Sequence, residues 1–196
     1  MTGTASPSES VTRRKAGRGH RARWIALGVL VAGAALVAVL ATRPQASATE
    51  VDTPLLGHPA PALTGATLSG GSFDLGALRG RWVVIDFFAS WCPPCQQEEP
   101  ELVSFAFEHR APGDAALVGV VFDDAASSAR SFLQTSGGTW PAVSDPGGQL
   151  ALAYGVRAPP ETFLVSPAGL VVAHLDGPLT ASGLDYWLHR ASQEAS

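Results

Sequence analysis

The chain has 196 residues, 46% of them apolar, which is enough for one ordinary domain with a buried core plus a terminal extension. From residue 49 onward it carries 16 acidic and 6 basic residues. Such an acidic domain would repel phosphate groups, which argues against a nucleic-acid partner.

The N-terminal part is first basic and then apolar. Residues 1–23 are predicted to form a basic cytoplasmic tail. Residues 24–41 carry no charge, and 18 apolar residues are just enough to cross a bilayer as a helix. Only Arg43 follows closely, so the positive-inside rule places the N-terminus in the cytoplasm. The sequence therefore predicts a single-pass cell-membrane anchor that holds the following domain outside the cytoplasm.

A cleaved signal peptide is the alternative to this anchor. Ala46, Ser47 and Ala48 fit an A-x-A cleavage site, and cleavage after Ala48 would give a secreted domain. The long apolar run and the long basic region before it favour an uncleaved anchor. Residues 42–56 are then predicted to be a linker, and residues 57–192 the folded domain.

Strand-like and helix-like segments alternate along this domain. The predicted elements are a hairpin at 62–73, a helical turn at 75–78, strands at 82–88, 115–122, 162–165 and 170–174, and helices at 93–110, 125–135, 149–154 and 181–191. The first two of these strands are apolar apart from one aspartate, Asp86, which is typical of strands covered on both faces. The order predicts an α/β fold with a mixed central sheet flanked by helices.

The strongest chemical signal is Trp91-Cys92-Pro93-Pro94-Cys95, which follows the predicted strand 82–88 and begins a predicted helix. The chain has only these two cysteines, and their spacing allows a small disulfide ring. Free N–H groups and the dipole at a helix N-terminus favour thiolate over thiol at the first cysteine. Thiolate is the attacking species in disulfide exchange. We therefore expect Cys92 to be the exposed nucleophile and Cys95 the shielded resolving thiol.

Other uses of two cysteines fit less well. A structural zinc site needs four ligands, and the sequence has neither a second cysteine pair nor a suitably spaced histidine pair. Covalent haem attachment needs a histidine after the second cysteine, where Gln96 stands. A purely structural disulfide rarely takes this spacing at a strand–helix junction. The sequence therefore predicts redox chemistry that needs neither a metal nor a cofactor.

Two longer segments, FASWCPPCQQEEP and YGVRAPPETFLV, resemble the membrane-tethered thioredoxin-like proteins of the TlpA, ResA and CcmG (DsbE) type. The resemblance extends over about residues 57–188. It implies a thioredoxin-like fold, dithiol exchange with protein disulfide substrates, and recycling by an electron donor in the membrane. It also suggests the reduction of apocytochrome c before haem attachment.

Two acids are candidates for catalytic proton transfer. Asp86 lies in a predicted buried strand, where a carboxylate costs free energy unless its pKa rises or it finds partners. The alternative is an aspartate satisfied at a strand edge. Glu98 lies three residues after Cys95, on the same helix face, and matches the acid of the ResA-type motif. Its alternative is an ordinary first-turn acid favoured by the helix dipole, the class to which Glu99 and Glu101 are assigned.

The resemblance also predicts the substrate-binding residues. It implies that Pro160 follows a cis peptide bond near the cysteines and that the backbone of Pro159 pairs with the substrate. Because proline has no N–H, one of the two usual backbone hydrogen bonds cannot form there. Trp91 is expected to shield Cys92 and to touch the partner. Glu161 is expected to line the rim of the site, with a solvent-facing side chain as the alternative.

Three other activities compete with a disulfide reductase. A peroxidase of the peroxiredoxin type would need Thr or Ser three residues before the reactive cysteine, where Ala89 stands. A disulfide-forming oxidant could use the same scaffold, but neither Pro93 nor Pro94 offers an N–H to a Cys92 thiolate, which favours a reducing couple. A non-catalytic holder of an apoprotein or assembly factor would not need the cysteines at all.

Overall fold

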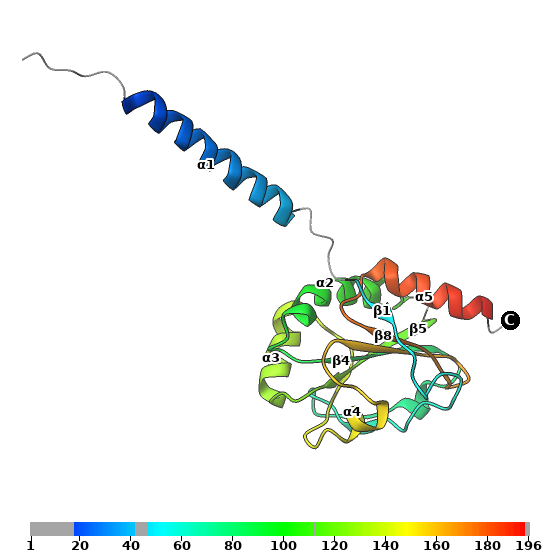
Figure 1. The fold of residues 1–196 in the computed structure, drawn as a ribbon. Helices are drawn as coiled ribbons and strands as arrows, with labels where there is room; N and C mark the ends of the chain where they lie inside the picture. Colours follow the sequence, from blue (N-terminus) through cyan, green and yellow to red (C-terminus); the bar gives the residue numbers. More distant parts are fainter. Residues whose placement is uncertain (1–17, 42–46, 112, 195–196) are drawn as a thin grey trace, which may run out of the picture. The chain divides into compact units, whose positions relative to one another are not determined.

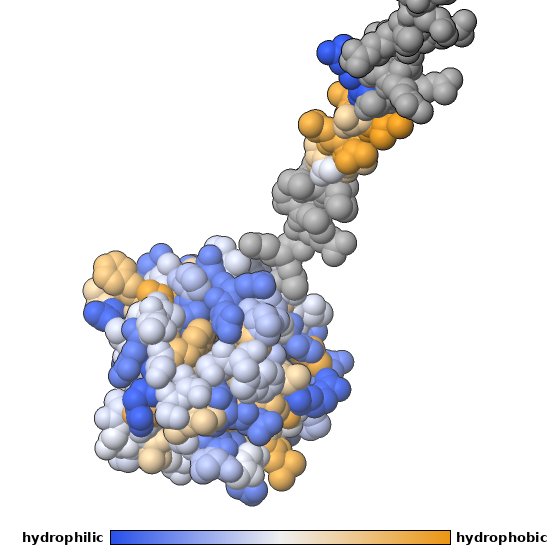
Figure 2. Space-filling view, turned by 90° about the vertical axis from the view of Figure 1, so that its left-hand side faces the viewer, coloured by the Kyte–Doolittle hydropathy of each residue, from blue (hydrophilic) through white to orange (hydrophobic). Residues whose placement is uncertain are grey.

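The computed structural model describes residues 18–41, 47–111 and 113–194, so the tail residues 1–17 and the linker residues 42–46 lie outside it. The chain divides into two compact units, Met1–Gln45 and Ala46–Ser196. The first unit contains the 24-residue helix α1, Arg18–Ala41. Its described side chains are largely apolar and exposed, as Figure 2 shows, with Trp24 70% and Ile25 68% exposed.

Helix α1 covers the segment predicted as an anchor. Among residues 23–34, 47–111 and 113–193, whose side chains the structure describes, no helix is long and apolar enough to cross a membrane.

The second unit is built on a sheet of six strands, which is mixed, as the sequence predicted. Its strands, in spatial order, are β1 (Thr49–Glu50), β8 (Val171–Asp176), β7 (Glu161–Val165), β4 (Trp82–Phe88), β5 (Ala115–Val121) and β6 (Ala142–Ser144). Strand β4 pairs in parallel with β5 and antiparallel with β7. It is therefore central, which explains why its residues on both faces are apolar apart from Asp86.

Helices and a small hairpin cover the two faces of this sheet (Figure 1). These elements are α2 (Pro93–Glu108), α3 (Ala126–Ser136), α4 (Gln149–Tyr154), α5 (Ala181–Glu194), the 3₁₀ turn η1 (Leu75–Leu78) and the hairpin strands β2 (Thr64–Ala66) and β3 (Ser72–Asp74). All of these had counterparts in the sequence-based prediction. Side chains alternate along β4, so Val84 packs with residues of α2 and α5, whereas Val83 packs with residues of α4.

Two strands lie where the sequence predicted none. Strand β6 has three residues and pairs with β5. Strand β1 falls within residues 42–56, which were predicted to be a linker, and pairs with β8. Neither segment is long enough to display a strand periodicity, and only pairing with a neighbour makes each one a strand. The folded unit consequently begins before residue 57.

Candidate functional site

The two cysteines lie at the carboxyl end of the central strand β4. Cys92 is the N-cap residue of α2, and Pro93 and Pro94 fill the first two helical positions. Proline suits these positions because their N–H groups would have no partner inside the helix. Cys92 and Cys95 form a disulfide with their Cα atoms 5.3 Å apart.

The hydrogen bonding favours charge on the first sulfur. The Cys95 N–H donates to Cys92 Sγ at 3.2 Å. Because Pro93 and Pro94 have no N–H, this is the first donor of the helix that can serve Cys92, as the sequence predicted. A helix N-terminus that directs an N–H at a sulfur stabilises that sulfur as thiolate.

The exposure of the sulfurs differs from expectation. Cys92 is 2% exposed and Cys95 is 1% exposed, so the prediction of an exposed Cys92 is wrong for this disulfide form. The exposed group is Trp91, at 53%, whose indole N–H donates to the carbonyl of Asp123 at 3.0 Å. Trp91 therefore stands at the surface beside the buried disulfide.

The segment 157–161 reaches the cysteines from the other end of the sequence. The peptide bond between Pro159 and Pro160 is cis, as predicted. The carbonyl oxygen of Pro159 lies 3.4 Å from Cys92 Sγ. The fold thus brings together two predicted groups that are 67 residues apart in the sequence.

Glu161 does not line the rim of the site, and the solvent-facing alternative is also wrong. Its side chain is 2% exposed. Oε1 accepts from the N–H groups of Arg157 and Ala158, at 2.7 and 3.1 Å, and Oε2 bonds to Nε2 of His174 at 2.7 Å. Burial raises the pKa of Glu161, but the bonds from His174 and the two N–H groups outweigh it and leave the pKa below its usual value. Glu161 therefore holds the backbone that leads into the cis proline.

Asp86 and Glu98 are buried, at 1% and 2% exposure, and Glu98 shares the buried face of α2 with Cys95. Asp86 belongs to a central strand, so the alternative of a strand-edge aspartate is excluded. Burial, and then the charge of Glu99, raises the pKa of Asp86 to about 8. Burial, and then the charge of Asp86, raises the pKa of Glu98 to about 10. These two carboxyl groups therefore hold their protons at neutral pH.

Few donors compensate for the burial of these acids. The N–H of Leu179 donates to Glu98 Oε2 at 3.0 Å. Within the described part of the chain, Asp86 Oδ1 and Glu98 Oε1 have no hydrogen-bond partner. Each of these two carboxyl groups therefore keeps one buried oxygen without a partner in the described part of the chain.

A third acid, Glu99, was missed by the sequence analysis. It was assigned to the surface acids of the first helical turn, yet it is 2% exposed. Burial raises its pKa to about 7, although a hydrogen bond from Ser136 opposes this shift. The helical period could have predicted this burial, because Glu99 falls on the face of α2 that is buried. The buried residues of that helix are Cys95, Glu98, Glu99, Leu102 and Phe105.

A hollow of about 750 Å³ lies beside the site and is lined by Asp123, Asp124, Asp145 and Leu152, among others. Asp123 is the residue that receives the Trp91 hydrogen bond, and Asp124 accepts from the N–H of Ser90 at 2.7 Å. The hollow therefore adjoins the exposed tryptophan.

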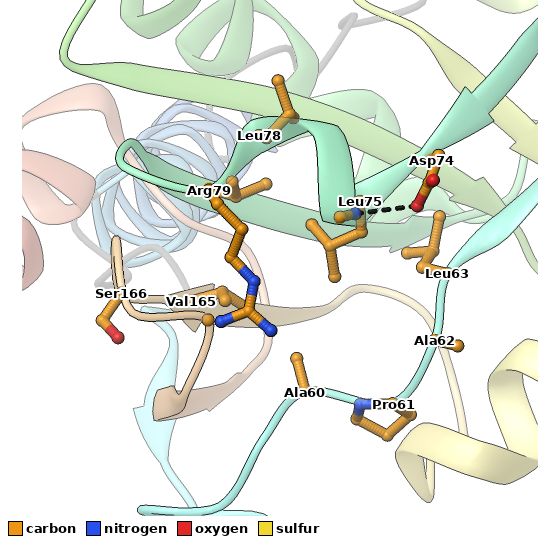
Figure 3. Close-up of a pocket in the computed structure, with 13 residues that line it drawn as sticks. Ala60, Pro61, Ala62, Leu63, Asp74, Leu75, Leu78, Arg79, Val165 and Ser166 are labelled. Atoms are coloured by element: carbon orange, nitrogen blue, oxygen red, sulfur yellow. Dashed lines mark hydrogen bonds between the residues drawn. The ribbon is translucent and has the colours of Figure 1, made fainter.

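Figure 3 shows a different cavity, of about 230 Å³, between η1 and the turn that joins β7 to β8. Arg79 extends toward this turn and donates to the carbonyl of Ala168. Arg79 precedes β4 whereas Cys92 follows it, so this cavity lies at the opposite end of a seven-residue strand. It is lined by no cysteine and takes no part in the redox site.

Comparison with known proteins identifies relatives of this arrangement. Residues 56–174 match the model of the AhpC/TSA family. A thiol:disulfide interchange protein DsbE homolog of Paracoccus denitrificans is 37% identical over 128 residues, which are 64% of this chain and 68% of the relative. The thiol-disulfide oxidoreductase ResA of Bacillus subtilis is 30% identical over 126 residues, 64% of this chain and 70% of the relative.

A solved structure agrees with these relatives. The thiol:disulfide interchange protein of the thioredoxin family from Chlorobium tepidum superimposes with a TM-score of 0.63 and 25% identity, covering 72% of this chain and 99% of that one. The fold, the cysteine pair and the sequence relatives agree. The chain belongs to the AhpC/TSA family and is a thioredoxin-like thiol-disulfide oxidoreductase of the DsbE and ResA type.

Proposed function

We propose that this oxidoreductase reduces protein disulfides outside the cytoplasm by dithiol exchange through Cys92 and Cys95. The observation that carries the proposal is the position of the pair. Cys92 caps α2, receives the Cys95 N–H, and lies 3.4 Å from the carbonyl of Pro159. This arrangement combines a stabilised attacking sulfur, a neighbouring resolving thiol and a backbone edge for the substrate.

The exchange proceeds in two displacements. The Cys92 thiolate attacks one sulfur of the substrate disulfide, which forms a mixed disulfide and releases the other substrate sulfur as a thiolate. Cys95 then gives its proton to Asp86 or Glu98, whichever was left as a carboxylate when the protein disulfide was reduced, and attacks Cys92 Sγ. The second substrate sulfur leaves as a thiolate, and each substrate thiolate takes up a proton. The protein dithiol becomes a disulfide, and the substrate disulfide becomes a dithiol.

Three residues around the pair serve substrate binding in this proposal. The carbonyl of Pro159 accepts a hydrogen bond from the substrate backbone, and the cis bond before Pro160 presents that carbonyl. Trp91 provides exposed apolar surface beside the disulfide. Glu161 acts indirectly, because its hydrogen bonds to Arg157 and Ala158 fix the segment that precedes the two prolines.

The proposed direction of electron flow predicts the redox potential. Pro93 and Pro94 withhold two N–H groups from the Cys92 thiolate, and a less stabilised thiolate gives a more reducing couple. Titration of the chain against glutathione or dithiothreitol should give a midpoint potential more negative than about −200 mV. A value near −120 mV, typical of strong oxidants, would instead support the alternative of a disulfide-forming protein.

The proposed substrate is an oxidised apocytochrome c. This inference rests on the resemblance to the TlpA, ResA and CcmG type. The test substrate is a peptide that carries the haem-attachment cysteines as a disulfide, and it is mixed with the reduced chain. A holder of apoprotein would bind this peptide without reducing it, so release of its thiols separates the two functions.

We also propose that residues 24–41 anchor the chain in the membrane, with the N-terminus in the cytoplasm and an unidentified membrane protein as the electron donor. The proposal is supported by an uncharged apolar run behind a basic segment, within a segment that forms the helix α1. The chain should sediment with membranes and resist extraction by carbonate. A soluble form that begins at Thr49 would instead indicate cleavage after Ala48.

A further inference from the structure

Glu99 is a buried acid that the exchange reaction above does not use. It follows Glu98 on α2 and shares the buried face of that helix with Cys95. Gly138, in the segment that follows α3, lies directly against it. A Cβ atom on Gly138 would come within 2.9 Å of Glu99 Oε1, so the close approach depends on glycine. Because Gly138 lies so close, Glu99 is only 2% exposed to solvent.

The one side-chain partner of Glu99 in the described structure can serve both of its protonation states. The hydroxyl of Ser136 lies 2.9 Å from Glu99 Oε1 and 2.9 Å from the carbonyl oxygen of Phe132. A hydroxyl has one hydrogen to donate and two lone pairs that accept. It can donate to an ionised Glu99, or accept from a protonated Glu99 while it donates to Phe132.

The charged groups around Glu99 are mainly acids. Asp86 faces it from β4 and Glu98 from α2, and the charge of Glu99 raises the pKa of both. Helix α3 contributes the uncharged hydroxyl of Ser136. Since burial raises the pKa of Glu99 itself to about 7, its charge appears close to neutral pH.

Two arginines border the segment that covers Glu99, but their guanidinium groups bond elsewhere. Arg110 donates to the hydroxyl of Thr139 at 3.1 Å, and Arg130 donates to the carbonyl of Leu68 at 2.7 Å. Among the ion pairs of the described residues, neither arginine is paired with Glu99. The charge of Glu99 is therefore felt mainly by the two neighbouring acids.

We propose that Glu99 is a positioning residue of the redox site, whose carboxylate, in addition to burial, holds Asp86 and Glu98 in their protonated forms so that they can supply a proton to Cys95. The inference rests on the proposed dithiol exchange and concerns the half-reaction that recharges the protein. In the disulfide form, Glu98 lies on the same buried face of α2 as Cys95, and both carboxyl groups hold their protons. A thiolate that forms at Cys95 can then take a proton from a buried carboxyl group, so no water molecule has to enter the site.

The recharging step balances with a dithiol as the reductant. A reductant thiolate attacks Cys92 Sγ, the bond between the two protein sulfurs breaks, and its electron pair goes to Cys95 Sγ. Asp86 or Glu98 gives a proton to Cys95 and becomes a carboxylate. The second reductant thiol loses its proton to solvent and displaces Cys92 as a thiolate, so the reductant becomes a disulfide.

The test is the pH profile of this step in the full-length chain, kept in detergent. The rate constant for reduction by dithiothreitol is followed by tryptophan fluorescence and divided by the thiolate fraction of the reductant. In the unaltered chain the first fall of this corrected rate should have an apparent midpoint near pH 8, where Asp86 ionises, and Glu98 should sustain the remaining rate up to about pH 10. Glu99→Gln should move the midpoint down by about one pH unit, because a like charge is removed.

The matched control is Glu108→Gln, which removes a charge from the exposed face of the same helix and should leave the midpoint unchanged. Ser136→Ala should move the midpoint in the same direction by less, because an ionised Glu99 loses its donor. If Glu99→Gln does not fold, the Ser136→Ala profile decides. Profiles that coincide with the Glu108→Gln profile overturn the inference, whereas an unaltered chain that dithiols cannot reduce overturns the proposed function.

Discussion

Replacing Cys92 with Ser should lower the turnover of protein disulfides by at least about 10³-fold, because the attacking sulfur is lost. Replacing Cys95 with Ser should also stop turnover, but at a different point. The Cys92 thiolate can still attack the substrate, and no neighbouring thiol then resolves the product. The Cys95→Ser chain should therefore accumulate a covalent mixed disulfide with its substrates, and the Cys92→Ser chain should not.

The measurement is capture of mixed disulfides on non-reducing gels after acid quenching. The double variant, with Ser at both positions, is the control for non-covalent binding. The two cysteines are almost equally buried, so exposure cannot decide between them. The assignment depends on the Cys95 N–H, which points at Cys92 Sγ, and on Pro159, which approaches Cys92. Equal capture by both single variants would contradict it.

The same variants separate an enzyme from a holder. A protein that only binds an apoprotein should keep its function in cells when either cysteine is serine. Full function of Cys92→Ser in cells would therefore favour the holder, whatever the behaviour of the purified chain.

The sheet and its helices were predictable because long segments carry a clear pattern. Strand β4 is an apolar run, and α2 begins at two prolines, which suit the first positions of a helix. The cysteine pair at their junction was predictable for the same reason. Short strands such as β6 were not, because three residues show no period and become a strand only through pairing with β5.

The chemistry of the site was harder to predict than its position. The burial of Glu161 could not be read from the sequence, because it depends on His174, which is 13 residues away on β8. Nor could the burial of Cys92, which depends on the approach of the segment around Pro159. Both contacts join segments that are distant in sequence, and local pattern carries no information about them.

Glu99 is a different case, because the helical period placed it on the buried face of α2. The general preference for acids in the first turn of a helix led to the wrong assignment. A position three residues before the buried Leu102 and four after Cys95 outweighs that preference. For an acid that follows a buried cysteine on a helix, position on the helix therefore predicts burial better than residue type does.

The buried acids also predict how the stability of the oxidised chain depends on pH. Glu98 has a folded-state pKa of about 10, raised first by burial, whereas in the unfolded chain its pKa should lie near the ordinary value of 4.5. A group with a raised pKa contributes its full stability below the unfolded value and loses it as the pH rises toward the folded value. The free energy of unfolding should therefore fall between pH 5 and pH 9.

Glu98→Gln should flatten this fall. Each pH unit inside the window changes the free energy of unfolding by about 1.4 kcal/mol. Because the folded protein relaxes around an ionised Glu98, the fall between pH 5 and pH 9 should be smaller in Glu98→Gln than in the unaltered chain by on the order of 3 kcal/mol. Urea unfolding of the oxidised chain at a series of pH values measures this difference.

The two chains are compared by the slope of the free energy of unfolding against pH. A glutamine amide that is left without a partner at this buried position adds a cost that does not depend on pH. Glu108→Gln, on the exposed face of the same helix, should follow the unaltered chain. Parallel curves for Glu98→Gln and the unaltered chain would mean that Glu98 is ionised in the folded protein and cannot hold a proton for Cys95.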